Sequence, residues 1–293
     1  MRRITPHQAQ RGFMTIAQNI PGENYLELAY VQAMSIKLSM PGSQYAVAVD
    51  EYTLSQVEDK HRKIFDYIIP IEQDLAKDEE WKLSNEWQAF YLTPFKETIK
   101  LESDLIFTRS IAHWWNTFRL KNIVLSQGCK NYLGDISEVR NYRKVFDDNE
   151  LPDVYNGLMY FRYSVESAEF FWLAEQIFTN WKYVSDNLLK NSRDDNPTTD
   201  VVYALAAKTI GIETCTIPGV DFINFVHMKP AINGFFNNNS WHNIVMCETD
   251  LPMIRINNIN QYYPVHYYSK DWVTENLVKE YEDELGRRIS KSI

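Results

Sequence analysis

The sequence predicts an α/β fold with a mainly parallel, twisted sheet that is flanked by helices. Short apolar segments of strand length alternate with segments in which apolar residues recur at helical spacing, which is typical of βαβ units. In addition, 45% of the 293 residues are hydrophobic and 24% are charged, as in globular proteins. The alternation is clear in the N-terminal half, while the C-terminal half is less regular. One compact domain with a decorated C-terminal half is therefore expected.

The first elements follow a polar arm, residues 1–11. Residues 12–18 predict a buried strand, and residues 25–40 predict a helix that stops before Pro41-Gly42. The next predicted elements, in chain order, are strand 45–49, helix 54–65, strand 67–70, helix 81–90 and strand 97–101.

The second half predicts fewer strands. Its expected elements are strand 154–161, helix 166–180, polar loop 191–198, helix 199–211, strand 222–227 and the amphipathic helix 271–288. We expect residues 12–235 to form the main domain and residues 236–293 to form an extension that packs on it.

Composition narrows the classes of function. The net charge of −9 opposes indiscriminate binding to a phosphate backbone, although a local basic patch such as that at 140–144 would still allow a DNA contact. Three scattered cysteines (Cys129, Cys215 and Cys247) predict free thiols in a reducing cytoplasm. No apolar run approaches the roughly 18 residues that a membrane span needs.

Two carboxylates follow the predicted strand 97–101. Glu102 and Asp104 flank Ser103, and in an extended segment their side chains point to the same side. In parallel α/β sheets ligands bind beyond the carboxyl ends of the strands. Two carboxylates there can hold Mg²⁺ or Mn²⁺ and leave positions open for phosphate oxygens. The alternative is a solvated loop, since such triplets also occur by chance.

Other polar residues stand at similar places. His227 ends the predicted strand 222–227, and Lys229 follows it, so that an imidazole for a transition-type cation and an ammonium for a diphosphate are close. Lys82 is a second candidate contact for phosphate or sugar. Ala17, Gln18 and Asn19 end the first strand, where backbone amides and an amide side chain would read a nucleobase edge. The alternative is a histidine and lysines in polar turns.

The order of these segments resembles the GT-A fold of nucleotide-diphospho-sugar transferases, and it is similar to the glycogenin and galactinol synthase group. The resemblance covers about three quarters of the chain, from Gly12 to Pro230. The matching segments are Thr15-Ile-Ala-Gln-Asn19 with Tyr25, Lys82, Leu101-Glu-Ser-Asp-Leu-Ile106, Tyr155-Asn-Gly-Leu-Met159, Asp200-Val-Val202, and His227 with Lys229. The segments at 81–87 and 112–116 also resemble glycosyltransferase sequences of large tailed phages.

The resemblance implies a transferase that moves a sugar from a nucleotide-diphosphate sugar, a UDP-sugar in that group, with retention of configuration. It implies a Mn²⁺ or Mg²⁺ ion on Glu102, Asp104 and His227. The donor contacts that it implies are Ala17, Gln18, Asn19, Tyr25, Lys82, Glu102, Ser103, Gly157 and Lys229. Asp104, Asn156 and Asp200 form the implied catalytic set, in which Asn156 and Asp200 hold the sugar or the acceptor hydroxyl.

Two features depart from the group's pattern. The first acid is Glu102 where the group has Asp, and the loop from His227 to Pro230 is shortened, so that either Lys229 or a later residue is expected to reach the diphosphate. The acceptor is open between a hydroxymethylated base in phage DNA, which would place the protein in the host cytoplasm, and a glycan or protein. A non-catalytic relic of the fold that binds nucleotides or glycans is the alternative to an enzyme.

Overall fold

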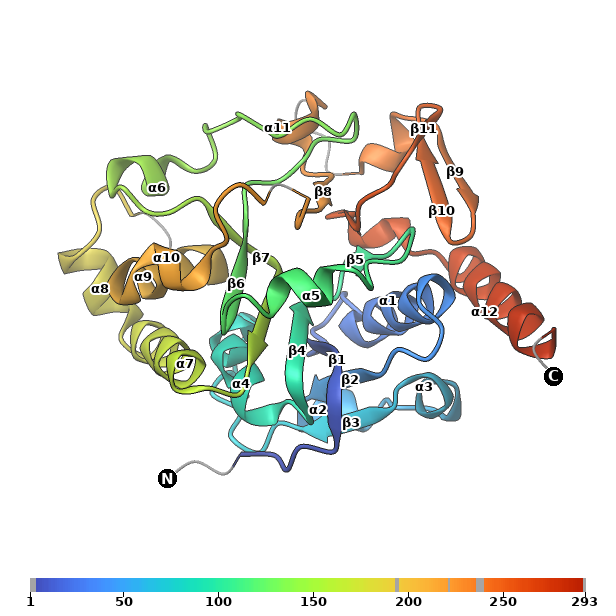
Figure 1. The fold of residues 1–293 in the computed structure, drawn as a ribbon, viewed down its shortest axis with the longest axis horizontal. Coiled ribbons are helices and arrows are strands. Elements are labelled where there is room, and N and C mark those ends of the chain that lie inside the picture. The colour runs from blue at the N-terminus through green and yellow to red at the C-terminus, as the bar shows by residue number, and fades with distance from the viewer. Residues whose placement is uncertain (1–3, 193–194, 221, 236–239, 292–293) are drawn as a thin grey trace.

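The computed structural model describes residues 4–192, 195–220, 222–235 and 240–291. Residues 1–3 of the expected arm, 193–194 of the expected polar loop and 236–239 of the expected extension lie outside the described residues. A six-stranded sheet in the order β3–β2–β1–β4–β7–β6 forms the centre of the molecule (Figure 1). Its strands are β1 (Ala9–Ile16), β2 (Tyr45–Val49), β3 (Tyr67–Pro70), β4 (Phe95–Leu101), β6 (Ile123–Gln127) and β7 (Val154–Arg162).

The sheet is mainly parallel, as the sequence predicts. β3, β2, β1 and β4 run in one direction, and Thr15 of β1 pairs with Val47 of β2 and Leu101 of β4. β7 runs antiparallel to both of its neighbours, β4 and β6. The predicted strands 45–49 and 67–70 are confirmed at their bounds. The first is fully buried in the interior of the sheet and therefore forms a continuous apolar run, whereas the second is the partly exposed edge strand.

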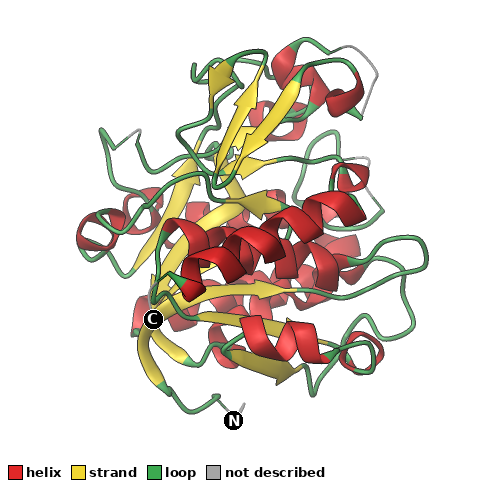
Figure 2. Ribbon diagram, turned by 90° about the vertical axis from the view of Figure 1, so that its right-hand side faces the viewer, coloured by secondary structure: helices red, strands yellow, loops and turns green. Residues whose placement is uncertain are grey.

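Two helical layers cover the sheet (Figures 1 and 2). One core lies between the sheet and α1 (Tyr25–Ser39) with α12 (Glu275–Ser290), and it contains alternate residues of the strands, such as Phe13 and Val47. The other core contains Met14 and Ala46 and is closed by α7 (Val165–Thr179) and α9 (Thr199–Ile210). Successive strand residues therefore point into opposite cores, as the period of two requires.

Several helices differ from the predicted ones. The predicted helix 54–65 is divided into α2 (Glu51–Leu54) and α3 (Asp59–Ile64), because Asp50 and Glu58 each begin a new turn by accepting backbone N–H groups. The predicted helix 81–90 is a 3₁₀ helix (Lys82–Gln88) followed by α4 (Ala89–Leu92). The remaining helices are α5 (Trp114–Phe118), α6 (Lys144–Asp148), α8 (Trp181–Asn187), α10 (Ile212–Cys215), α11 (Pro230–Asn233) and the 3₁₀ turns Trp241–Asn243 and Lys270–Trp272.

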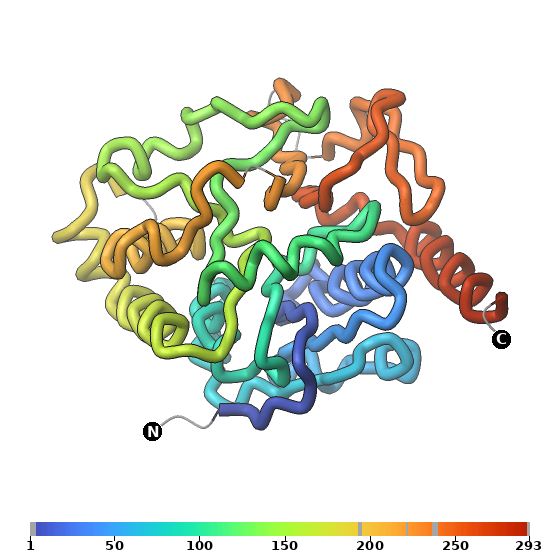
Figure 3. Tube along the Cα trace, in the orientation of Figure 1, coloured from blue at the N-terminus to red at the C-terminus, as the bar shows by residue number. Residues whose placement is uncertain are grey.

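The C-terminal part contributes two small sheets. β9 (Cys247–Asp250), β10 (Met253–Ile256) and β11 (Ile259–Asn260) form an antiparallel sheet next to α12. The second sheet joins β5 (Leu105–Ile106), β12 (Val265–His266) and β8 (Val226–His227), so the predicted strand 222–227 is reduced to its last two residues. The trace in Figure 3 shows these orange and red segments beside the green segment that follows β4. Among the described residues, no helix combines the length and the apolar character needed to cross a bilayer.

Candidate functional site

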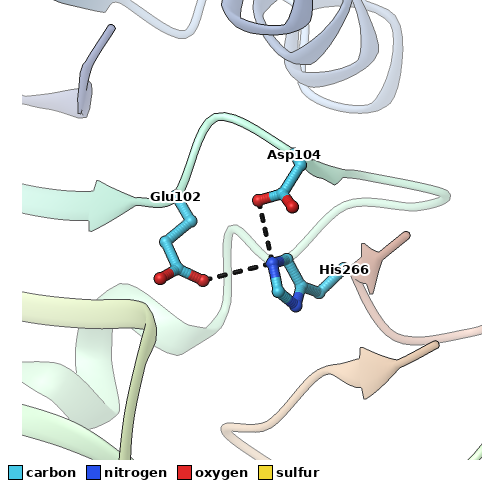
Figure 4. Close-up of side chains that lie close together, drawn as sticks. All are labelled: Glu102, Asp104 and His266. Atoms are coloured by element: carbon cyan, nitrogen blue, oxygen red, sulfur yellow. Dashed lines mark hydrogen bonds and ion pairs between the residues drawn. The ribbon is translucent and has the colours of Figure 1, made fainter. Parts of the chain in front are cut away.

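Glu102, Asp104 and His266 meet just beyond the carboxyl end of β4 (Figure 4). Nε2 of His266 lies 2.8 Å from Oδ1 of Asp104 and 3.1 Å from Oε2 of Glu102. Asp104 and His266 are buried, while the Glu102 side chain is about one-third exposed (32%). One face of the group is therefore open to solvent or a ligand.

The small sheet of β5, β12 and β8 positions His266 beside the carboxylates. β12 is antiparallel to β5, with His266 opposite Leu105, and the Tyr267 amide donates to the Asp104 carbonyl at 3.0 Å. Since Leu105 follows Asp104 directly, this pairing fixes the imidazole beside the acidic segment although 162 residues separate Asp104 from His266.

Lys270 completes the surroundings of Asp104. Its ammonium forms an ion pair with Oδ2 of Asp104, on the oxygen that does not face His266. Burial by itself raises the pKa of Asp104, but His266 and Lys270 outweigh it and hold that pKa well below its usual range. The pKa of Glu102 is raised, chiefly by burial. Asp104 is thus the stronger anion of the two carboxylates.

His227 lies behind His266 and not beside the carboxylates. The two Nδ1 atoms are 2.7 Å apart and the ring centroids 4.4 Å apart. Burial and the neighbouring His266 and Lys229 hold the pKa of His227 well below its ordinary value, whereas the pKa of His266 is raised by the two carboxylates against the effect of burial. In the part of the chain that the structure describes, His266 and not His227 joins Glu102 and Asp104 in the group that could hold an ion.

A buried network supports Glu102 from the other side. Nδ2 of Asn156 donates to Oε1 of Glu102 at 3.1 Å, and Oδ1 of Asn156 accepts from Lys100 at 2.8 Å. The fully buried Lys100 also forms an ion pair with Glu86. The amide N–H of Asn156 donates to Oδ1 of Asp200 at 2.6 Å, so Asp200 fixes the start of β7.

A pocket of about 500 Å³ opens in front of the acidic group. Six residues predicted from the sequence line it: Gln18, Tyr25, Lys82, Glu102, Ser103 and Asp104. His266, Lys270, Tyr268, Trp81 and Glu86 also line it. The pocket combines apolar and aromatic walls with charged groups, as small-molecule sites do.

Two of the lining residues are held by neighbours. The Lys82 ammonium donates to the carbonyl of Ala76 at 2.6 Å and lies 4.0 Å from Asp50, which draws it toward the loop that follows β3. The Gln18 amide donates to Asp50 at 3.1 Å and accepts from Asn85 at 3.0 Å. These contacts position both side chains at the edge of the pocket before any ligand binds.

Three other residues that were predicted to contact the donor instead make contacts within the fold. Ala17 is fully buried, and its amide donates to Ala48 within the sheet. Oδ1 of Asn19 accepts from the amide of Leu26 in the first turn of α1. Gly157 packs so closely against Phe225 that a Cβ at position 157 would lie 2.8 Å from the ring.

Lys229 and Asp200 contact aromatic and basic side chains next to the pocket. The Lys229 ammonium lies 4.4 Å from the centre of the Tyr142 ring and 5.7 Å from that of Tyr268, and burial lowers its pKa. NH1 of the buried Arg143 lies 3.2 Å from Oδ2 of Asp200. Both residues thus belong to a polar cluster next to the pocket and do not line it.

The three side chains fit a divalent cation. Two carboxylate oxygens and one imidazole nitrogen are the donors that Mn²⁺ and similar ions accept. With metal–ligand bonds of about 2.1 Å, neighbouring ligands of an octahedral ion are about 3 Å apart. The spacings of 2.8 and 3.1 Å around Nε2 of His266 match that edge.

The sequence-based prediction did not include His266 and Lys270. They stand four residues apart after a short apolar segment, the same kind of signal that pointed to His227 and Lys229. A strand of two residues carries no periodicity, however, and only its pairing with β5 and β8 assigns it to the site.

No family model and no curated protein matches the sequence. Among solved structures, the glycosyltransferase GlyE of Streptococcus pneumoniae TIGR4 is similar over 97% of this chain and 65% of its own, with a TM-score of 0.54 and 11% identity. The chain thus spans a little under two thirds of the length of GlyE.

Two further structures are more distant. The match to the galactosyltransferase LgtC (TM-score 0.42, 10% identity) covers 66% of this chain and 70% of the LgtC chain. The match to mouse xyloside xylosyltransferase 1 (TM-score 0.45, 10% identity) covers 80% of this chain and 90% of the xylosyltransferase chain. At these identities the likeness concerns the fold alone, and it rests on GlyE: a central, mostly parallel sheet between helices, as in GT-A glycosyltransferases.

Proposed function

We propose that this protein is a metal-dependent glycosyltransferase that moves a sugar from a nucleotide-diphosphate sugar to an acceptor hydroxyl. The observation that carries the proposal is the group Glu102, Asp104 and His266 at one end of the 500 Å³ pocket. It lies beyond the carboxyl end of a parallel strand, where ligands of open α/β sheets bind. The GT-A fold is consistent with this activity.

Glu102, Asp104 and His266 would hold Mn²⁺ or Mg²⁺, whose charge would stabilise the departing diphosphate. Lys270 lines the same pocket and would provide a second positive charge near that leaving group. Tyr25 lines the pocket with its ring and is proposed to stack on the nucleobase, uracil in the case of a UDP-sugar.

Asn156 and Asp200 are proposed to face the sugar and the acceptor. Asn156 touches Glu102, and Asp200 is linked to Asn156 through its backbone, so both lie on the β7 side of the carboxylates. We assign no side chain as general base, because with retention of configuration the leaving phosphate takes the acceptor proton. Lys82 and Lys229 would contribute positive charge around the diphosphate without touching Asp104.

For the acceptor, a glycan or a protein hydroxyl fits the net charge of −9 better than DNA does. A hydroxymethylated base in DNA would need a local basic surface. The comparison that separates these classes is transfer of labelled sugar to hydroxymethylcytosine-containing DNA, to unmodified DNA and to an oligosaccharide mixture. Transfer to modified DNA alone would overturn the preference for a glycan or protein.

Calorimetric titration of UDP with and without Mn²⁺, combined with release of UDP from several UDP-sugars, tests the activity. We expect nucleotide affinity that depends on Mn²⁺, and sugar release that stops in excess chelator. Asp104→Asn is expected to lose both, whereas the matched exposed variant Asp186→Asn keeps them. Full activity of Asp104→Asn or in chelator contradicts metal dependence, and a folded protein without any metal-dependent nucleotide affinity indicates a non-catalytic relic.

A further inference from the structure

The two buried histidines at the site are joined by one short contact whose proton can sit on either ring. Nδ1 of His227 and Nδ1 of His266 are 2.7 Å apart, a hydrogen-bond distance that needs one N–H and one lone pair. His227 and His266 stand opposite each other on the parallel strands β8 and β12, and both are buried. The pairing of the strands, rather than a chance rotamer, therefore sets the contact.

The position of the proton decides what His266 can do with its other nitrogen. Nε2 of His266 faces Asp104 and Glu102. If the His227 ring donates, neutral His266 carries its proton on Nε2 and can only donate to the carboxylates. If His227 accepts, His266 carries a proton on Nδ1, and Nε2 can give up its own proton and offer a lone pair to a cation bound beside the carboxylates.

We propose that His227 is a positioning residue that accepts the Nδ1 proton of His266 and so holds the His266 ring with Nε2 directed at the cation position beside Glu102 and Asp104. This inference rests on the proposed function, because it gives His227 a role in the cation site without making it a ligand. A ligand histidine commonly donates its second N–H to such a partner, which fixes its tautomer and orientation. Nδ1 of His227 lies within hydrogen-bond distance of Nδ1 of His266 and can be that partner.

Packing around the pair holds both rings in place. Phe225 makes edge contacts with both rings, at centroid distances of 6.1 Å to His227 and 5.9 Å to His266. The amide of Met228 donates to the His266 carbonyl at 2.9 Å, so the backbone of β8 is tied to β12 directly beside the pair. A variant of His227 therefore changes the hydrogen bond while the strand pairing remains.

Three variants separate the hydrogen bond from packing. His227→Leu removes the acceptor, and His227→Asn keeps one, since Oδ1 of asparagine takes roughly the place of Nδ1. Met228→Leu alters the adjacent fully buried side chain and is the control for packing. The first readout is the dissociation constant for Mn²⁺ alone, from calorimetry or from the spin resonance of free Mn²⁺.

We expect His227→Leu to weaken Mn²⁺ binding about 10- to 100-fold and His227→Asn to stay within a few-fold of the wild type, like Met228→Leu. The second readout needs no metal: ¹⁵N spectra of histidine-labelled protein should show neutral His227 with its proton on Nε2 and its Nδ1 accepting from Nδ1–H of His266. In His227→Leu the Nδ1–H of His266 should lose the shift that this hydrogen bond causes.

The inference is overturned if His227→Leu binds Mn²⁺ as tightly as the wild type, or if neutral His227 carries its proton on Nδ1 in the wild type. Failure of the proposed function looks different: the wild type then binds no Mn²⁺ at all. In that case the ¹⁵N signature by itself still decides whether His227 sets the tautomer.

Discussion

The ammonium of Lys100 donates a 2.8 Å hydrogen bond to Oδ1 of Asn156 and forms an ion pair with Glu86, although Lys100 is fully buried. Since Asn156 in turn donates to Glu102, this buried cation is connected to the candidate metal site through two hydrogen bonds. It links the stability of the domain to the orientation of Glu102.

Replacing Lys100 by Met should leave the buried Glu86 carboxylate without its cation. We expect the free energy of unfolding in urea to fall by about 3–5 kcal/mol. The double variant Lys100→Met/Glu86→Gln should recover much of this loss, because no uncompensated charge is then buried. If the single and double variants lose the same amount, the pair is not the source of the effect.

Asp104→Asn removes the stronger of the two carboxylates at the site. We expect a fall of at least about 100-fold in divalent-dependent sugar release, the scale of losing one major electrostatic group in an active site. Glu102→Gln should have a smaller effect, since that side chain is partly exposed and carries a raised pKa. Initial rates at several Mn²⁺ concentrations measure both, and equal losses would contradict the ranking.

Gly157→Ala places a Cβ 2.8 Å from the Phe225 ring, which itself packs on both site histidines. We expect a loss of about 1–3 kcal/mol in the free energy of unfolding, as for other overpacked positions, and weaker Mn²⁺ binding. Gly286→Ala is the matched control, because nothing lies within 4 Å of its Cβ on the helix α12. There the same change should be neutral or stabilising by up to about 1 kcal/mol. Equal effects at the two glycines would contradict the steric cause.

Glu97, which lies away from the site, makes the free energy of unfolding depend on pH. Burial raises its pKa, but hydrogen bonds from Arg119 and Gln10 outweigh this and hold the pKa below the ordinary value of 4.5. Because the folded-state pKa is the lower one, the stabilisation is fully present above about pH 4.5 and is lost as the pH falls through the folded-state value.

Glu97→Gln should therefore flatten the acid side of the stability profile between pH 3 and 6, measured by urea unfolding. The exposed Glu51→Gln should leave that profile unchanged. A Glu97→Gln profile that keeps the wild-type slope would show that other carboxylates govern acid unfolding.

Most strands of the sheet followed from the residue pattern. Tyr45–Val49 and Tyr67–Pro70 were predicted at their bounds, the first because a buried parallel strand forms an uninterrupted apolar run. β6 (Ile123–Gln127) was not predicted, because its apolar part is only three residues long and a short run does not separate strand from helix. The division of helix 54–65 was missed because it depends on caps at Asp50 and Glu58, which the apolar pattern does not record.

By itself the sequence determined the mainly parallel sheet and the placing of Glu102 and Asp104 beyond its fourth strand, since both follow from local periodicity and from the ends of strands. Tertiary structure decided which imidazole stands beside those carboxylates. His227 and His266 both end two-residue strands, and only the pairing of β12 with β5 brings His266 to Asp104 and leaves His227 behind it. Contacts between segments more than 150 residues apart depend on how the chain packs, and no local pattern encodes them.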